Sequence, residues 1–184
     1  MHVYIVAITP SPESCTLIRR YQDLYPQYNR YHIPPHITLY PPFHLQNSSE
    51  EHITKLLQEE IGHLKRETIY VKDVGYFKGK NNVIYLKPNA PSTEWLRTVF
   101  STVSQAIQEA VVHAFSDYSM DAKAYNPHIT IAEQIPQEHF EYIKKEVGPI
   151  DPFFFTVQGI DLYRRSPETK QYDKILEIPF ATKN

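Results

Sequence analysis

The sequence has little cysteine and little glycine. Cys15 is the single cysteine among 184 residues, so the chain can form neither an internal disulfide nor a cysteine-based zinc site. Only 5 glycines are present, and neither a Walker-type phosphate loop nor a dinucleotide-binding fingerprint occurs. These two absences argue against the nucleotide-binding classes that depend on glycine-rich loops.

The chain also lacks a long apolar run and a strong charge of one sign. Its first residues, MHVYIVAITP, contain no basic region and no cleavage signal, so we interpret them as a first strand rather than an export signal. No stretch approaches the length of a membrane span. The net charge of −2 argues against a broad footprint on duplex DNA but allows a small phosphate ligand or one RNA end. We therefore expect a cytoplasmic protein without a membrane or duplex DNA partner.

The composition is otherwise that of an ordinary folded domain. Hydrophobic residues make up 41% and charged residues 22% of the chain, and its length suits one domain or two small lobes that share a core. The sequence carries no signal for an oligomeric state, and we favour a monomer.

Short segments rich in β-branched and aromatic residues alternate with amphipathic segments. The first kind predicts strands at residues 2–8, 36–40, 68–76, 82–87, 128–131, 153–163 and 174–178. The second kind predicts helices at residues 12–24, 48–65, 92–115 and 137–146. Ser11 is the expected cap of the first helix, with Pro12 at its first position. The order of these elements predicts an α+β fold.

The predicted elements divide into two similar halves. Residues of about 1–81 and 82–184 each form strand, helix, strand, helix and a hairpin-like pair if the strand at 82–87 also begins the second half. This order indicates an internal duplication with one lobe per half, and strands can exchange between the lobes. The alternative is the ordinary alternation of any α+β chain.

The tripeptide His-Ile-Thr occurs three times, and its context differs between the copies. The copy at His52 lies among acidic residues and apolar residues at helical spacing. On a helix, residues i and i+2 point about 200° apart, so His52 and Thr54 cannot converge on one ligand. We interpret this copy as a solvent-exposed helical histidine.

The other two copies share a strand-like setting, in PPHITLY and YNPHITIAE. Each histidine directly follows a proline, which is tolerated at the start of a strand. Because side chains alternate along a strand, His36 and Thr38 share one face, as do His128 and Thr130. One strand from each half can therefore present an imidazole and a hydroxyl to a common cleft.

This arrangement suits phosphoryl transfer. One neutral imidazole can accept a proton from the attacking hydroxyl or water, while a second, protonated imidazole gives a proton to the leaving oxygen. The two threonine hydroxyls can donate to the non-bridging oxygens. These residues alone leave open which histidine has which role. The alternative is a pair of half-buried structural histidines.

The paired motifs HITL at 36–39 and HITI at 128–131 resemble those of the two-histidine phosphoesterase superfamily. This superfamily includes the 2′-5′ RNA ligase-like proteins and cyclic phosphodiesterases. The resemblance implies a bilobal fold with two antiparallel sheets, backed by helices, around a central cleft. It implies metal-independent chemistry without a cofactor on 2′,3′-cyclic or 2′-5′ phosphodiesters of RNA ends or nucleotides. It also implies that His36 is the proton donor, His128 the proton acceptor, and Thr38 and Thr130 the phosphate-binding residues.

Further candidates lie near the motifs. Tyr40, Phe43 and Tyr125 are possible stacking partners for a base, and Tyr172 is a possible substrate contact. Each can equally belong to the core or the rim of the cleft. Basic residues in the two hairpins can attract an anion or remain solvated: Lys78, Lys80, Arg164, Arg165 and Lys170. Two other functions stay open, namely a module that binds RNA ends or nucleotides without turnover and a metal-dependent hydrolase that uses the same histidines.

Overall fold

The computed structural model describes residues 2–29, 32–79, 81–114 and 120–181. The strands in these residues are β1 (Val3–Ile8), β2 (Ile37–Leu45), β3 (Glu67–Phe77), β4 (Asn82–Pro88), β5 (Val111–His113), β6 (Ile129–Ile135), β7 (Phe153–Val157), β8 (Gly159–Arg165) and β9 (Tyr172–Pro179). The helices are α1 (Pro12–Gln22), η1 (Pro26–Tyr28, a 3-10 turn), α2 (Glu50–Ile61), α3 (Ala90–Ile107) and α4 (Gln137–Val147). In these parts of the chain, no helix combines the length and apolarity that crossing a membrane requires.

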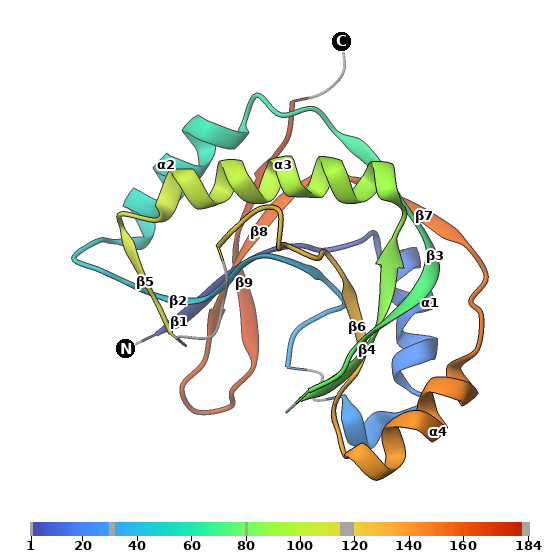
Figure 1. The fold of residues 1–184 in the computed structure, drawn as a ribbon. Helices are drawn as coiled ribbons and strands as arrows, with labels where there is room; N and C mark the ends of the chain where they lie inside the picture. The colour runs from blue at the N-terminus through green and yellow to red at the C-terminus, as the bar shows by residue number, and fades with distance from the viewer. Residues whose placement is uncertain (1, 30–31, 80, 115–119, 182–184) are drawn as a thin grey trace.

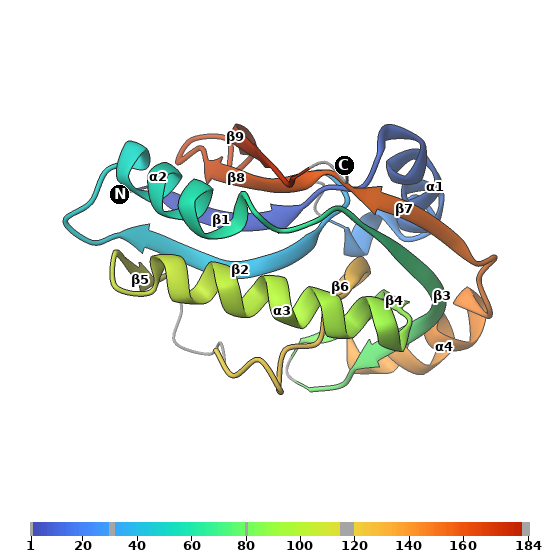
Figure 2. The same ribbon diagram turned by 90° about the horizontal axis from the view of Figure 1, so that it is seen from above.

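Two antiparallel sheets stand side by side (Figure 1). The first has the order β5-β2-β1-β8-β9 and the second β6-β4-β3-β7. Helices α2 and α3 pack together, with α2 on β9 and α3 on β2, while α1 packs on β6 and β7 and α4 on β4 (Figures 1 and 2). The predicted α+β fold with two antiparallel sheets backed by helices is confirmed.

Both sheets take strands from both halves of the sequence. In the first sheet β1 and β2 precede residue 81, and β5, β8 and β9 follow it. In the second sheet β3 comes from the first half, and β4, β6 and β7 from the second. The division into lobes at about residues 81 and 82 remains a prediction, in which strand exchange accounts for this mixture.

Local signals explain where the helices begin. The side chain of Ser11 accepts a hydrogen bond from the Ser14 backbone N–H, and Pro12 occupies the first turn of α1, as predicted. Ser49 caps α2 and Asn89 caps α3 in the same way. The apolar faces of these helices and of both sheets meet in one large core.

Two predicted elements were wrong. The helix predicted over 92–115 ends at Ile107, and Val111–His113 instead form β5, which pairs with the outer end of β2. The β-branched pair Val111 and Val112 suits this extended pairing. The single strand predicted over 153–163 is two strands in different sheets, since β7 pairs with β3 and β8 pairs with β1.

Gly159 marks the change of sheet between β7 and β8. A Cβ atom at this position would lie 2.2 Å from the carbonyl oxygen of Ile178, so the close approach of β8 and β9 requires glycine there.

Candidate active site

The structure brings His36, Thr38, His128 and Thr130 together around one cavity of about 640 Å³. His36 and Thr38 come from the start of β2 in the first sheet, and His128 and Thr130 from the start of β6 in the second. The cavity therefore lies between the two sheets, where the two motifs face each other.

A β-bulge follows the threonine in the first motif. Thr38 pairs with Ala7 and Tyr40 pairs with Val6, so Leu39 is an extra residue on β2. Thr38 shares the cavity face with Ala7, whereas Tyr40 shares the core face with Val6. The bulge thus ends the alternation that the sequence pattern predicts.

The second motif carries the same bulge at the same position. Thr130 pairs with Tyr85 and Ala132 pairs with Ile84, so Ile131 is an extra residue on β6. Ala132 and Ile84 belong to the core, whereas Thr130 lines the cavity. The two motif strands are therefore matched in backbone register as well as in residue type.

Both imidazoles are held by the same hydrogen bond. His36 Nδ1 lies 2.9 Å from the carbonyl oxygen of Pro34, and His128 Nδ1 lies 2.8 Å from that of Asn126. A carbonyl oxygen can only accept, so Nδ1 carries the proton in both rings. In the neutral imidazole, Nε2 is then the free base on the side of the ring away from the backbone.

Burial favours the neutral form of both histidines. Desolvation lowers the pKa of His36 to about 4; the bond to Pro34 opposes this shift, and the nearby His128 adds to it. Desolvation likewise lowers the pKa of His128, against the bond to Asn126. Without a bound anion, both rings are neutral at pH 7, and each presents an unprotonated Nε2.

An aromatic wall supports His128. The rings of Phe77 and Tyr85 each lie 5.0 Å from its imidazole, centroid to centroid, and Phe77 and Tyr85 lie 4.4 Å from each other. The Asn126 amide donates to the Tyr85 hydroxyl at 3.0 Å, next to the carbonyl that holds His128. No local sequence pattern marks these residues, because the wall forms only when β3, β4 and the segment before β6 come together.

A side chain distant in sequence binds the carbonyl oxygen of each motif threonine. The Tyr125 hydroxyl donates to the Thr38 carbonyl at 2.8 Å, and Gln22 Nε2 donates to the Thr130 carbonyl at 2.9 Å. Asn29 Nδ2 donates to the next carbonyl, that of Ile131, at 3.0 Å. These bonds tie the two motif strands to the rest of the cavity wall. Gln22 and Asn29 were not predicted as site residues, because no local pattern in the sequence distinguishes them.

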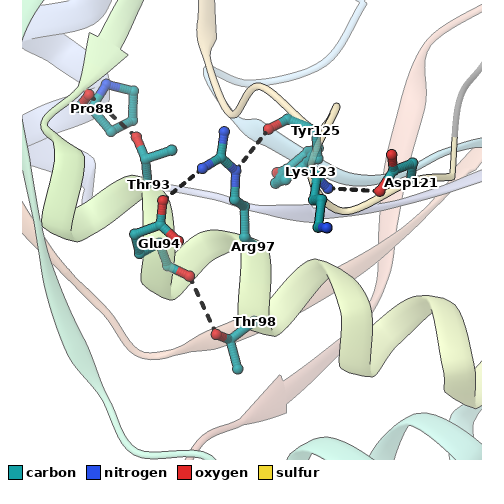
Figure 3. Close-up of polar contacts among 8 residues, drawn as sticks. All are labelled: Pro88, Thr93, Glu94, Arg97, Thr98, Asp121, Lys123 and Tyr125. Atoms are coloured by element: carbon teal, nitrogen blue, oxygen red, sulfur yellow. Dashed lines mark hydrogen bonds and ion pairs between the residues drawn. The ribbon is translucent and has the colours of Figure 1, made fainter.

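The segment before β6 is anchored to α3 (Figure 3). Arg97 Nε donates to the Tyr125 carbonyl at 3.3 Å, and its guanidinium also pairs with Glu94 at 2.6 Å. The ring of Tyr125 stacks on Phe100, with 4.2 Å between centroids and 10° between planes. Burial raises the pKa of Tyr125, so its hydroxyl remains a donor toward Thr38.

The structure separates the four aromatic candidates into two groups. Tyr125 and Tyr172 line the cavity. Tyr40 and Phe43 do not: they are 1% and 0% exposed and pack edge to face in the core, so their predicted role as substrate contacts was wrong. For Tyr40 the reason is the bulge at Leu39, which turns its side chain away from the face of Thr38, while Phe43 pairs with Tyr4 after a second register shift on β2.

Three of the basic residues of the hairpins contact other protein groups. Arg164 pairs with Glu50 of α2 at 2.9 Å, and Lys78 pairs with Glu141 at 3.2 Å. Lys170 Nζ donates to the Pro167 carbonyl within the turn. Arg165 does not line the cavity, and Lys80 lies outside the described residues.

The third tripeptide copy is separate from the cavity. His52 is exposed in the first turn of α2, as predicted, and does not line the cavity. For metal binding, no group of three or more His, Cys, Asp or Glu side chains comes together within residues 2–29, 32–79, 81–114 and 120–181.

Two histidine–threonine pairs that face one cavity between two sheets define the class of the two-histidine phosphoesterases. The family model of the 2′-5′ RNA ligase superfamily matches residues 10–169. The chain therefore belongs to the 2′-5′ RNA ligase superfamily, and the resemblance inferred from the two motifs is confirmed. The prediction of an enzyme that acts on phosphodiester bonds is confirmed at this level.

Relatives in sequence are named as phosphoesterases, and two solved structures share the fold. A Bacillus licheniformis protein named as a candidate phosphoesterase is 26% identical over 136 residues, which are 73% of either chain. A Staphylococcus aureus protein with the same name is 26% identical over 145 residues, or 78% of either chain. The fold is shared with TT0787 of Thermus thermophilus (TM-score 0.65, 17% identity, 100% of both chains) and with Escherichia coli LigT (TM-score 0.63, 18% identity, 98% of both chains).

Proposed function

We propose that the protein is a metal-independent phosphodiesterase that acts on 2′,3′-cyclic or 2′-5′ phosphodiester bonds of RNA ends or nucleotides. The observation that carries this proposal is the matched geometry of the two motifs. Two imidazoles, each with Nδ1 bound to a backbone carbonyl, and two threonines on equally bulged strands line one cavity.

In the proposed reaction His128 is the base and His36 is the acid. Nε2 of His128 takes a proton from water as the water oxygen forms a bond to phosphorus, and the ester P–O bond breaks. Nε2 of His36, protonated in the substrate complex, gives its proton to the leaving oxygen. The hydroxyls of Thr38 and Thr130 donate to the non-bridging oxygens, where charge accumulates in the transition state.

The acid needs a proton that it lacks in the free protein at pH 7. Burial lowers the pKa of His36 to about 4. A bound phosphodiester places a negative charge beside this ring, and a nearby opposite charge raises the pKa of a histidine. A phosphodiester bound between the two rings therefore favours a proton on one of them, and the second ring stays neutral because two positive charges at this separation repel each other. In the proposed assignment His36 carries this proton.

The size of the cavity and the ligands of a protein with the same fold support a nucleotide-sized substrate. A volume of about 640 Å³ lies in the range of pockets for small molecules and cofactors. Escherichia coli LigT has been solved with 3′-AMP and with phosphate. We infer that the cavity accepts a nucleotide or a single RNA end.

The test is hydrolysis of the four 2′,3′-cyclic nucleotides and of 2′-5′-linked ApA by the purified protein in excess EDTA. We expect turnover that falls roughly 10²–10⁴-fold in His36→Ala and in His128→Ala. Binding without turnover would instead establish a binding module. Turnover that is lost in EDTA and restored by a divalent metal would establish a metal-dependent hydrolase.

A further inference from the structure

A carboxylate lines the same cavity as the proposed phosphate site. Glu133, near the end of β6, is the one acidic residue among the described residues of the cavity wall, which include neither Lys nor Arg. Its side chain is half-buried and has no hydrogen bond or ion pair to another described residue. Neither of its oxygens belongs to the buried atoms that lack a partner, so a ligand can reach both of them.

The register of β6 places Glu133 on the same face of the sheet as Thr130. Val83 of β4 faces both Glu133 and Gln134, because the pairings on either side of it enclose one residue on β4 and two on β6. Gln134 takes the extra position of this bulge with a left-handed backbone (φ 54°). Ala132 belongs to the core, so Glu133, the next residue along the strand, points toward the cavity.

Glu133 lies one row of side chains beyond the phosphate site. Thr130 pairs with Tyr85, whereas Glu133 is opposite Val83, two residues further along β4. Two residues of a strand span about 7 Å. Val83 pairs in turn with Phe77, which lines the cavity. This row therefore offers an apolar surface with a carboxylate at its edge, about 7 Å from the threonine that is proposed to bind the phosphate.

A nucleobase suits this position. In a nucleoside 2′,3′-cyclic phosphate the ribose separates the phosphate from the base, so a phosphate at Thr130 brings the base to the next row. An ionised carboxylate only accepts hydrogen bonds, and it repels the acceptor atoms of a base. On their Watson–Crick edges, adenine, cytosine and uracil each place an acceptor next to a donor. Guanine alone has two adjacent N–H donors, at N1 and N2, which match the two oxygens of a carboxylate.

We propose that Glu133 is a specificity-determining residue that binds the Watson–Crick edge of guanine, so that the enzyme prefers guanosine 2′,3′-cyclic phosphate and RNA ends that terminate in guanosine. This inference rests on the proposed function. The guanine ring lies on the side of the cavity that Phe77 lines, and the two Glu133 oxygens accept from N1–H and N2–H. The phosphate stays between His36 and His128, and the reaction itself is unchanged.

The test is competition between the guanosine and adenosine 2′,3′-cyclic phosphates in an equimolar mixture with excess EDTA. The initial ratio of the two products equals the ratio of the two kcat/KM values and does not depend on the amount of active enzyme. We expect the wild type to favour guanosine roughly 5- to 100-fold, the discrimination that one bidentate contact to a base provides. Inosine 2′,3′-cyclic phosphate lacks only the 2-amino group, and its kcat/KM should lie between the other two.

Two variants separate base recognition from a general effect on the cavity. Glu133→Gln keeps the size of the side chain but turns a donor toward the donors of guanine, and we expect the product ratio to fall roughly fivefold or more. Its kcat/KM for the adenosine substrate should not fall, because the change also removes a negative charge from a cavity that binds an anion. Glu109→Gln makes the same charge change at an exposed position outside the cavity, and we expect the wild-type ratio.

A wild type that opens the adenosine, cytidine or uridine substrate as well as the guanosine substrate would overturn this inference and leave the proposed function intact. Equal losses on all four substrates in Glu133→Gln would also overturn it, since they would indicate a contact to the ribose or a structural role. Failure of the wild type to open any cyclic phosphodiester would instead overturn the proposed function, and this inference with it.

Discussion

Gly75 controls the position of His128 through the Tyr85 ring. Gly75 on β3 lies opposite Tyr85 on β4. A Cβ atom at position 75 would lie 2.2 Å from Cε2 and 2.4 Å from Cζ of the Tyr85 ring, while ordinary contact begins at 3.4 Å. The ring must therefore retreat by about 1 Å, yet it is packed between Phe77 and His128.

We expect Gly75→Ala to lower kcat/KM for a 2′,3′-cyclic nucleotide about 10²-fold, because a shift of about 1 Å at a reacting group can cost that factor. Overpacking should also lower the free energy of unfolding by roughly 1–3 kcal/mol, which leaves a folded protein to assay. The measurements are steady-state kinetics and urea unfolding followed by circular dichroism.

Gly79→Ala is the matched control from the same hairpin. A Cβ atom there meets nothing within 4 Å, so we expect wild-type kinetics and stability. Wild-type kcat/KM in Gly75→Ala, or equal losses in the two variants, would refute the inference that Tyr85 positions His128.

Three other predictions concern the motif residues. The losses of kcat in His36→Ala and His128→Ala should not add in the double variant, because the two rings act in one step, and additive losses would contradict paired action. As the control, His52→Ala should retain wild-type kcat. Thr130→Val should weaken inhibition by inorganic phosphate about tenfold or more without unfolding the protein, since it removes a hydrogen bond to a charged group; an unchanged inhibition constant would exclude Thr130 from the phosphate site. The pKa of His36 is about 4 in the folded chain against 6.5 ordinarily, so the unfolded chain takes up this proton first. The free energy of unfolding should therefore fall as the pH drops from 6.5 to about 4, less steeply in His36→Gln or with saturating phosphate, as measured by urea unfolding at each pH.

Local features of the sequence were sufficient for several parts of this structure. The proline before each motif histidine and the alternation after it predicted two strands with His and Thr on one face, and these four side chains line one cavity. Helical spacing and acidic neighbours placed His52 on a helix surface. Ser11 and Pro12 marked the start of α1, because a cap depends on residues adjacent in the chain.

The remaining features depend on contacts between distant residues. The bulge at Leu39, which sends Tyr40 into the core, exists because β2 pairs with β1 in one particular register. Val111–His113 become a strand because the outer end of β2 offers them hydrogen bonds that a longer α3 would forgo. Gln22 meets Thr130 across 108 positions of sequence. Short-range periodicity thus determined which residues share a face, whereas strand register and the packing of the two sheets decided which faces meet and which polar atoms reach the cavity.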